Sequence, residues 1–133
     1  MDILTDSNIF IDLFKTNDAG IRSVFETENI VICGVIKAEL LHGAVSSRDF
    51  NRIEEMIKIF DSVDIEAEDW GKLGRLLYCF RTNGLSLPFQ DAIIAYLALK
   101  YQLTVWTKDP HFTHIQRIVP ELSLYHSESD TCD

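Results

Sequence analysis

Short apolar runs alternate along the chain with segments whose apolar residues recur every three or four positions. Runs rich in Ile, Val, Leu or Trp occupy residues 2–5, 30–33, 103–107 and 122–125, and a weaker run occupies 63–65. Runs of this length and composition are typical of strands. The pattern therefore predicts five strands, of which the one at 63–65 is a small edge strand.

The segments between these runs have helical periodicity. Apolar residues fall on one face of the segments 48–60 and 67–81, which predicts amphipathic helices. Residues 89–100, FQDAIIAYLALK, are apolar almost all round, so this helix should be deeply packed, and Pro88 suits its first turn. Strands that alternate with helices predict an α/β fold, in which a parallel sheet is covered on both faces.

Length and composition are those of an ordinary globular protein. The chain has 133 residues, 47% of them hydrophobic and 25% charged, which suits one domain with a buried core. We expect this domain to span residues 1–126 and the polar, acidic residues 127–133 to form a disordered tail. No apolar run approaches the roughly 20 residues needed to span a bilayer, and no basic segment leads into a signal-peptide core. These features predict a cytoplasmic protein without membrane contact.

The formal net charge of −9 conflicts with a simple electrostatic attraction to nucleic acid. A protein that held nucleic acid by charge alone would be basic. Either nucleic acid is not the ligand, or cations lie between the acidic side chains and the phosphates. The positions of the acids bear on this choice.

Four acids are placed so that they can meet at the carboxyl edge of the predicted sheet. Asp6 follows the first predicted strand, and Asp109 follows the fourth. Glu39 lies about one and a half turns into the helix that leaves the second strand, within roughly 8 Å of that edge. Asp91 lies in the first turn of a helix that runs antiparallel to the strand it feeds, so that turn lies at the same edge. Ligands bind at this edge in open parallel sheets.

Carboxylates gathered without cations would repel one another, and some would have raised pKa values. Hard divalent cations with oxygen ligands remove this repulsion, and Mg²⁺ and Mn²⁺ prefer such sites. Two such ions would neutralise four carboxylates and would still face a phosphate. The net negative charge is thereby reconciled with a nucleic-acid substrate.

Each of the four acids also has an ordinary structural explanation. Asp6 can serve as a turn or helix-cap residue, and Asp91 can complement the helix dipole from the first turn. Asp109 before Pro110 is a common turn pair. Glu39 would ordinarily be solvated, although its flanking residues are apolar. Because all four share one edge, the metal-site interpretation is stronger for the set than for any member.

Other polar residues near these positions receive mainly structural interpretations. A solvated helix entry is expected for Asp61, Asp64, Glu66, Glu68 and Asp69. Asp12 either supports Asp6 without being a ligand itself or lies on the surface. Lys108 either lies on the surface or contacts a phosphate.

Two histidines follow the last of the four acids. His111 and His114 have the spacing of a metal-binding pair, but Pro110 and Phe112 favour a turn at this point. We therefore expect His111 to be a structural residue or one on the substrate side.

The stretches LTDSNIFIDLF, KAELLHG, DAIIAYLA and VWTKDPHF together resemble the PIN-domain family, in particular the VapC-type toxin ribonucleases of bacterial toxin–antitoxin pairs. They occur in family order and span nearly the whole chain. The resemblance implies a three-layer α/β/α sandwich with a parallel sheet of about five strands. The segment SLPFQD departs from the glycine-led approach to the third acid that is more usual in the family.

The resemblance also implies roles for individual residues. The family's catalytic, metal-binding acids correspond to Asp6, Glu39, Asp91 and Asp109. Asn8 matches the asparagine that supports the first acid, and Thr107 matches the hydroxyl residue at the end of the late strand. Asp6 and Asp91 would be the principal ligands of Mg²⁺ or Mn²⁺.

The leading hypothesis is a Mg²⁺- or Mn²⁺-dependent endoribonuclease that acts as a toxin. Its partners would be an RNA substrate, a cognate antitoxin with an arginine-bearing segment, and a second copy of the chain in a homodimer. A receiver-type phosphoacceptor domain stays open as an alternative, with Lys108 as its lysine, although such a domain has two adjacent acids after its first strand. A catalytically inactive PIN-like binding module is the other alternative, and the intact acidic quartet argues against it.

Overall fold

Five parallel strands form one sheet in the computed structural model of the chain, which describes residues 1–126. Their order across the sheet is β3–β2–β1–β4–β5. Their bounds are β1 Asp2–Thr5, β2 Asn29–Cys33, β3 Asp61–Val63, β4 Thr104–Trp106 and β5 Ser123–Leu124. The parallel sheet is confirmed, and β3 is an edge strand that begins two residues before the predicted 63–65. The predicted tail at 127–133 lies outside the described residues.

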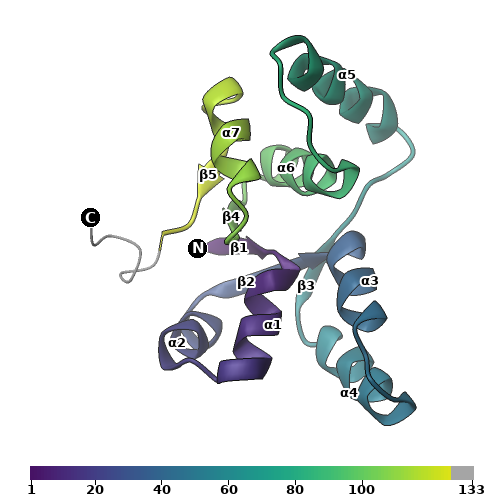
Figure 1. The fold of residues 1–133 in the computed structure, drawn as a ribbon, viewed down its shortest axis with the longest axis vertical. Helices are drawn as coiled ribbons and strands as arrows, with labels where there is room; N and C mark the ends of the chain where they lie inside the picture. Colours follow the sequence, from purple (N-terminus) through teal and green to yellow (C-terminus); the bar gives the residue numbers. More distant parts are fainter. Residues whose placement is uncertain (127–133) are drawn as a thin grey trace.

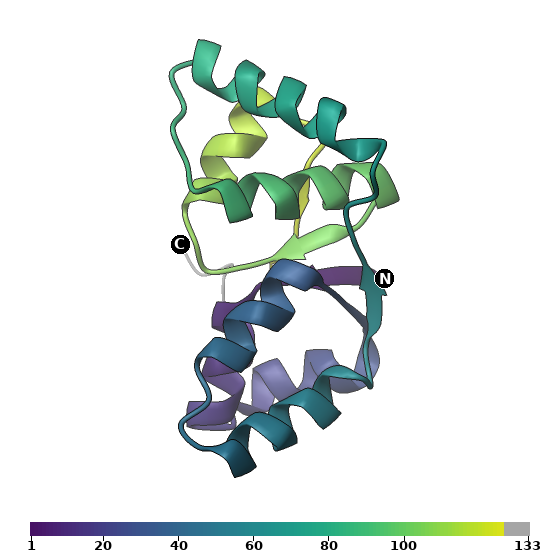
Figure 2. The same ribbon diagram turned by 90° about the vertical axis from the view of Figure 1, so that its right-hand side faces the viewer.

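Seven helices within residues 1–126 cover the two faces of the sheet (Figure 1). Their bounds are α1 Ser7–Thr16, α2 Ala19–Thr27, α3 Gly34–His42, α4 Ser47–Ile57, α5 Asp69–Thr82, α6 Phe89–Tyr101 and α7 His111–Ile118. Figure 2 shows α1 to α4 on one face and α5 to α7 on the other, which confirms the three-layer α/β/α sandwich. Right-handed crossovers explain the division, because connections toward β3 and connections toward β5 place their helices on opposite faces.

Helix α6 forms the centre of its layer. Every residue from Asp91 to Ala98 is buried, and Ile94 and Leu97 have no exposed surface. The helix is apolar on all sides because it packs between β4, α5 and α7. The prediction of a deeply packed helix is confirmed. Neither α6 nor any other helix within residues 1–126 is both long and apolar enough to cross a membrane.

Short polar side chains begin three of the four helices on the opposite face, namely α1, α2 and α4. Asp18 Oδ1 accepts a 3.0 Å hydrogen bond from Ile21 N at the start of α2, and Ser46 Oγ accepts one of 3.0 Å from Asp49 N at the start of α4. Asp6 holds the corresponding position before α1. Such caps satisfy N–H groups that have no partner within the helix. These polar residues therefore fix where the helices begin.

A buried ion pair joins α5 to α6. The carboxylate of Asp69 is fully buried and accepts hydrogen bonds from Tyr96 Oη at 2.7 Å and from Lys100 Nζ at 2.8 and 3.0 Å. These bonds from Lys100, one from Glu66 N and the one from Tyr96 lower the pKa of Asp69 to about 2. The expectation of a solvated side chain is therefore wrong for Asp69, because α6 brings a cation and a hydroxyl onto it.

The order of the strands reverses at β1, in the middle of the sheet. From β1 the chain proceeds to β2 and β3, and it then crosses back to form β4 and β5 on the other side of β1. Outside the carboxyl ends of the strands, such a reversal leaves a crevice in which ligands bind. Asp6 comes directly after β1 and Thr107 directly after β4, so both residues lie at this crevice.

Candidate metal centre

Asp6 is a buried carboxylate, 6% exposed, at the N-cap of α1. Its Oδ1 accepts a 2.8 Å hydrogen bond from Ser7 N. Its Oδ2 accepts hydrogen bonds from Thr107 Oγ1 at 2.7 Å and from Asn8 Nδ2 at 3.4 Å. The backbone N–H of Asp6 donates to the carbonyl of Trp106 at 2.9 Å. The carboxylate is therefore both a helix cap and a group held in a fixed direction at the sheet edge.

The side chains of Thr107 and Asn8 connect Asp6 to the segment that carries Asp109. Thr107 Oγ1 donates to Asp6 and accepts hydrogen bonds from Asp109 N at 3.0 Å and from Asn8 Nδ2 at 3.4 Å. Asn8 Oδ1 accepts a hydrogen bond of 3.4 Å from Lys108 N. Asn8 thus lies beside the first acid, as expected, and Thr107 makes the shorter bond to that acid.

A histidine connects the acids Asp91 and Asp109. Asp91 lies in the first turn of α6 and is 6% exposed, and Asp109 lies just before α7. His111 Nδ1 is 2.8 Å from Asp91 Oδ2 and 3.2 Å from Asp109 Oδ1. The backbone N–H of His111 also donates to Asp109 Oδ1 at 2.9 Å. His111 therefore lies between two of the predicted site acids, although the sequence did not place it there.

The turn predicted around His111 is wrong, because α7 begins at this residue. Pro110 precedes it with a φ of −65°, an angle that suits the start of a helix. Phe112 is fully buried and anchors the first turn. Pro110, with the apolar Phe112 two residues later, was thus the signal for a helix start. His114 lies one turn further along α7 and is exposed, and within residues 1–126 the close group of potential ligands includes His111 without it.

Glu39 reaches the same edge from α3. Ser7 Oγ donates a 3.3 Å hydrogen bond to Glu39 Oε2, which joins α1 to α3 beside Asp6. Desolvation and the negative charge of Asp6 raise the pKa of Glu39. All four predicted acids therefore converge on the carboxyl edge: Asp6 after β1, Glu39 in α3, Asp91 in α6 and Asp109 before α7.

The acids at this edge disfavour one another's charged forms. Burial raises the pKa of Asp6, and the charges of Asp91 and Asp109 raise it further, against the hydrogen bond from Thr107. Burial also raises the pKa of Asp91, and the hydrogen bond to His111 opposes this rise. That same hydrogen bond raises the pKa of His111. The cluster is short of positive charge, which a divalent cation would supply.

The donor atoms at the edge suit a divalent cation. Asp91, Asp109 and His111 each offer one ligand atom, and these atoms all lie within 4.8 Å of one another. Asp6 and Glu39 lie outside this close group, although the charge of Asp91 helps to raise the pKa of both. Carboxylate oxygens are the ligands that Mg²⁺ and Mn²⁺ prefer. Of the two predicted principal ligands, the close group thus contains Asp91 and not Asp6.

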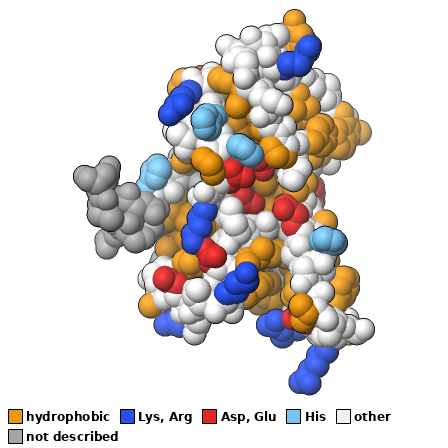
Figure 3. Space-filling model, in the orientation of Figure 1, with side chains coloured by type: hydrophobic (Ala, Val, Ile, Leu, Met, Phe, Trp, Pro, Cys, Tyr) orange, Lys and Arg blue, Asp and Glu red, His pale blue; other side chains and the backbone are white. Residues whose placement is uncertain are grey.

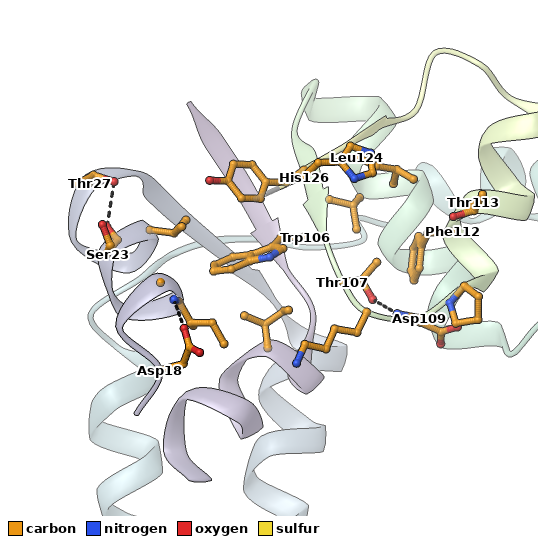
Figure 4. A pocket seen from close by; sticks show the side chains of 18 residues that line it. Asp18, Ser23, Thr27, Trp106, Thr107, Asp109, Phe112, Thr113, Leu124 and His126 are labelled. Atoms are coloured by element: carbon orange, nitrogen blue, oxygen red, sulfur yellow. Dashed lines mark hydrogen bonds between the residues drawn. The ribbon is translucent and has the colours of Figure 1, made fainter. Parts of the chain in front are cut away.

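A cavity of about 970 Å³ adjoins the acids on the side of α2. Figure 4 shows Thr107 and Asp109 at one end of this cavity, Trp106 along its wall and the side chains of α2 at the other end. In Figure 3, acidic side chains gather near the centre of the face, with His, Lys and Arg side chains around them. Because Asp109 belongs to both the cavity and the acidic cluster, a ligand held in the cavity would reach the cluster.

Lys108 is directed away from the acidic cluster. Its ammonium group forms an ion pair with Asp12 of α1 and is largely exposed. The two residues whose environment was left open by the sequence are therefore partners of each other. Lys108 does not supply the lysine that a receiver-type site needs beside its phosphoacceptor.

A family model for the PIN domain matches residues 3–118 of the chain. The matched range includes all four acids of the cluster, and also Thr107 and His111. No curated protein matches the chain.

Solved structures of VapBC complexes and VapC toxins have the same fold. DNA-bound VapBC from Salmonella typhimurium has a TM-score of 0.80 at 22% identity, and the match covers 94% of this chain and 97% of that chain. VapBC2 from Rickettsia felis, bound to a promoter DNA fragment, has a TM-score of 0.75 at 20% identity, with 96% and 100% covered. Mycobacterium tuberculosis VapC20, a sarcin-ricin loop cleaving toxin, has a TM-score of 0.66 at 15% identity, with 84% and 93% covered.

Proposed function

This chain belongs to the PIN-domain family, and on that premise we propose that residues 1–126 form a metal-dependent endoribonuclease, the toxin of a toxin–antitoxin pair. The observation that carries this function is the convergence of Asp6, Glu39, Asp91 and Asp109 from separate elements onto one sheet edge. Desolvation and mutual repulsion raise the pKa of Asp6, Glu39 and Asp91. A cluster of this kind suits a divalent cation and the phosphate that the cation would meet.

Mg²⁺ or Mn²⁺ at this edge would supply Lewis acidity toward a phosphodiester and activate water for its hydrolysis. Asp91 and Asp109 would hold the ion, with Asp6 and Glu39 completing the set of acids. Thr107 keeps Asp6 aimed at the edge through the 2.7 Å hydrogen bond and fixes the backbone of Asp109 through the 3.0 Å one. Groups that are held in place before the reaction need no reorganisation during it.

RNA as the substrate agrees with both the net charge and the cavity. At a net charge of −9 the protein does not attract RNA by charge alone, so the ion must make the central phosphate contact. The cavity beside Asp109 is lined by Trp106, Tyr125 and His126, which are side chains of the kind on which bases stack. Trp106 is only 4% exposed, so Tyr125 and His126 present the accessible rings. A nucleotide next to the cleaved phosphate would occupy this cavity.

The toxin role draws on the fold and on the charge of the edge. VapBC complexes and a toxin that cleaves the sarcin-ricin loop share this fold. A cognate antitoxin would restrain the enzyme by placing an arginine on the acidic edge, because the planar guanidinium group binds carboxylates through two hydrogen bonds. The active form would be a homodimer, and light scattering of the purified chain would test this.

Cleavage of RNA by the purified chain separates this function from its alternatives. Total RNA and a single-stranded RNA oligonucleotide would be incubated with the protein in Mn²⁺, in Mg²⁺ and in EDTA. We expect internal cleavage with either ion and none in EDTA. Cleavage that persists in EDTA would contradict metal dependence. Labelling of the protein by acetyl phosphate without RNA cleavage would support the receiver-type alternative. The absence of both labelling and cleavage would support the inactive binding module.

A further inference from the structure

His111 is the one nitrogen donor in the close group of potential ligands found within residues 1–126. We propose that His111 ligates the ion together with Asp91 and Asp109, and that the site consequently prefers Mn²⁺ to Mg²⁺. Because the ion is the one that the nuclease would use, this assignment rests on the proposed function. It adds a ligand from α7 and the identity of the preferred ion.

The spacing of the donor atoms matches a coordination shell. Adjacent ligands of an octahedral ion with bond lengths of 2.0–2.1 Å are about 2.8–3.0 Å apart. His111 Nδ1 is 2.8 Å from Asp91 Oδ2 and 3.2 Å from Asp109 Oδ1, so one distance falls in this range and the other lies just above it. An ion could therefore replace the hydrogen bond between histidine and carboxylate with little movement of the three side chains.

The local backbone holds the His111 ring at this position. Asp109 Oδ1 accepts a hydrogen bond from His111 N at 2.9 Å, which fixes the histidine beside the acid before any ion binds. Pro110 starts α7 directly before it, and the next residue, Phe112, is fully buried. The side chain of His111 is itself 40% exposed, so the ring borders the solvent from which an ion would come.

An imidazole ligand changes which ion the site prefers. Imidazole nitrogen suits transition metals, whereas Mg²⁺ favours oxygen ligands and keeps several waters. Two carboxylates and one imidazole would therefore bind Mn²⁺ more tightly than Mg²⁺. Without the imidazole, the remaining carboxylates would discriminate less between the two ions.

His114 provides a matched control for this ligand role. It lies on the same helix, one turn beyond His111, and is exposed. His111→Ala and His114→Ala therefore remove the same chemical group from neighbouring turns. Circular dichroism and thermal melts would show that both variants fold, and His111→Gln offers a second variant that keeps a polar side chain.

Pulsed electron paramagnetic resonance of bound Mn²⁺ reads the ligand directly. In the wild-type protein and in His114→Ala, we expect modulation from an imidazole ¹⁴N nucleus, and in His111→Ala and His111→Gln we expect none. Calorimetric titration should show that His111→Ala loses at least about tenfold in Mn²⁺ affinity, since loss of groups that only support a ligand already costs about 10–100-fold. The affinity for Mg²⁺ should change by less than that for Mn²⁺.

Absence of the nitrogen signal from wild-type protein with bound Mn²⁺ would overturn the assignment. Equal losses of Mn²⁺ and Mg²⁺ affinity in His111→Ala would also overturn it, because they would indicate a residue that only positions or neutralises the acids. Failure of the wild-type protein to bind Mn²⁺ would also contradict the assignment of His111 as a ligand. A nitrogen signal without RNA cleavage would support His111 as a ligand and contradict the nuclease function. RNA cleavage without the nitrogen signal would support the nuclease function and contradict His111 as a ligand.

Discussion

Thr107 and Asp6 are 101 residues apart in the sequence and are joined by a 2.7 Å hydrogen bond across the ends of β4 and β1. The same hydroxyl accepts a 3.0 Å hydrogen bond from Asp109 N. One side chain therefore sets the direction of one acid and the backbone position of another. Both acids lie at the carboxyl ends of the neighbouring strands β1 and β4, where the strand order reverses. Thr107 therefore supports the candidate metal centre from the sheet.

Thr107→Val should lower RNA cleavage by at least about tenfold while leaving the fold intact. The hydrogen bond that it removes lowers the pKa of Asp6, so its loss favours the protonated and inactive form of that acid. Hydrogen bonds to charged groups contribute about 1.5–3 kcal/mol, which corresponds to this loss of rate or more. Thr107→Ser keeps the hydroxyl and should retain most of the activity. Initial cleavage rates in saturating Mn²⁺ measure the effect, and equal rates for the Val and Ser variants would contradict it.

Strands, the buried helix and the positions of the acids could be predicted because their signals are local. The run at residues 2–5 is β1 itself, and the apolar segment at 89–100 is nearly the whole of α6. Asp6 and Asp109 could be brought together from sequence because the carboxyl ends of parallel strands share one edge. Asp91 could be assigned to that edge too, since its helix leads into β4.

Contacts that depend on how two helices pack could not be predicted. Asp69 has the sequence context of a solvated residue, and only the packing of α5 on α6 brings Lys100 onto it. The direction of the His111 ring likewise depends on where α7 begins and on how α7 lies against α6. Neither relationship leaves a periodic pattern in the chain.

Asp69→Asn should lower the melting temperature at neutral pH, because the partly buried ammonium group of Lys100 would lose its counter-charge. The pKa of Asp69 is about 2 in the folded protein, below its ordinary value of 3.8. The ion pair therefore contributes its full stability above about pH 4, and this contribution is lost as the pH falls toward 2. Thermal melts at several pH values should show the gap between wild type and Asp69→Asn narrowing over this range. A gap that stays constant down to the lowest pH would argue against an ionised Asp69.

Mn²⁺ should raise the melting temperature of the wild-type protein. A ligand that binds only the folded state stabilises it by about 2.7 kcal/mol at a free concentration one hundred times its Kd. Asp91→Asn should lose most of this gain, because Asp91 belongs to the close group of donors. Glu121→Gln, which removes an exposed acid between the end of α7 and the start of β5, should keep the whole gain. Equal rises in melting temperature with Mn²⁺ in the two variants would indicate that the ion binds elsewhere.

A cognate antitoxin should inhibit the enzyme through an arginine on the acidic edge. The product of the neighbouring gene would be co-purified with the chain and its arginines changed one at a time to alanine and to lysine. We expect one arginine whose loss restores cleavage and raises the affinity for Mn²⁺, because the guanidinium group and the ion compete for the same carboxylates. Lysine should replace it poorly. Inhibition that survives every substitution would rule out this form of control.

The acids at the carboxyl edge are the centre of the whole account, and the rate of RNA cleavage by single variants tests them most directly. Initial rates would be measured in Mn²⁺ for wild type, Asp6→Asn, Asp91→Asn and the control Glu121→Gln, with circular dichroism as the check on folding. Both Asn variants should lose at least about a hundredfold in rate, as expected when one preorganised charged group is removed, and Glu121→Gln should match wild type. Cleavage near the wild-type rate by one folded Asn variant would contradict the catalytic role of that acid. Cleavage near the wild-type rate by both variants would contradict the placement of the active site at this edge.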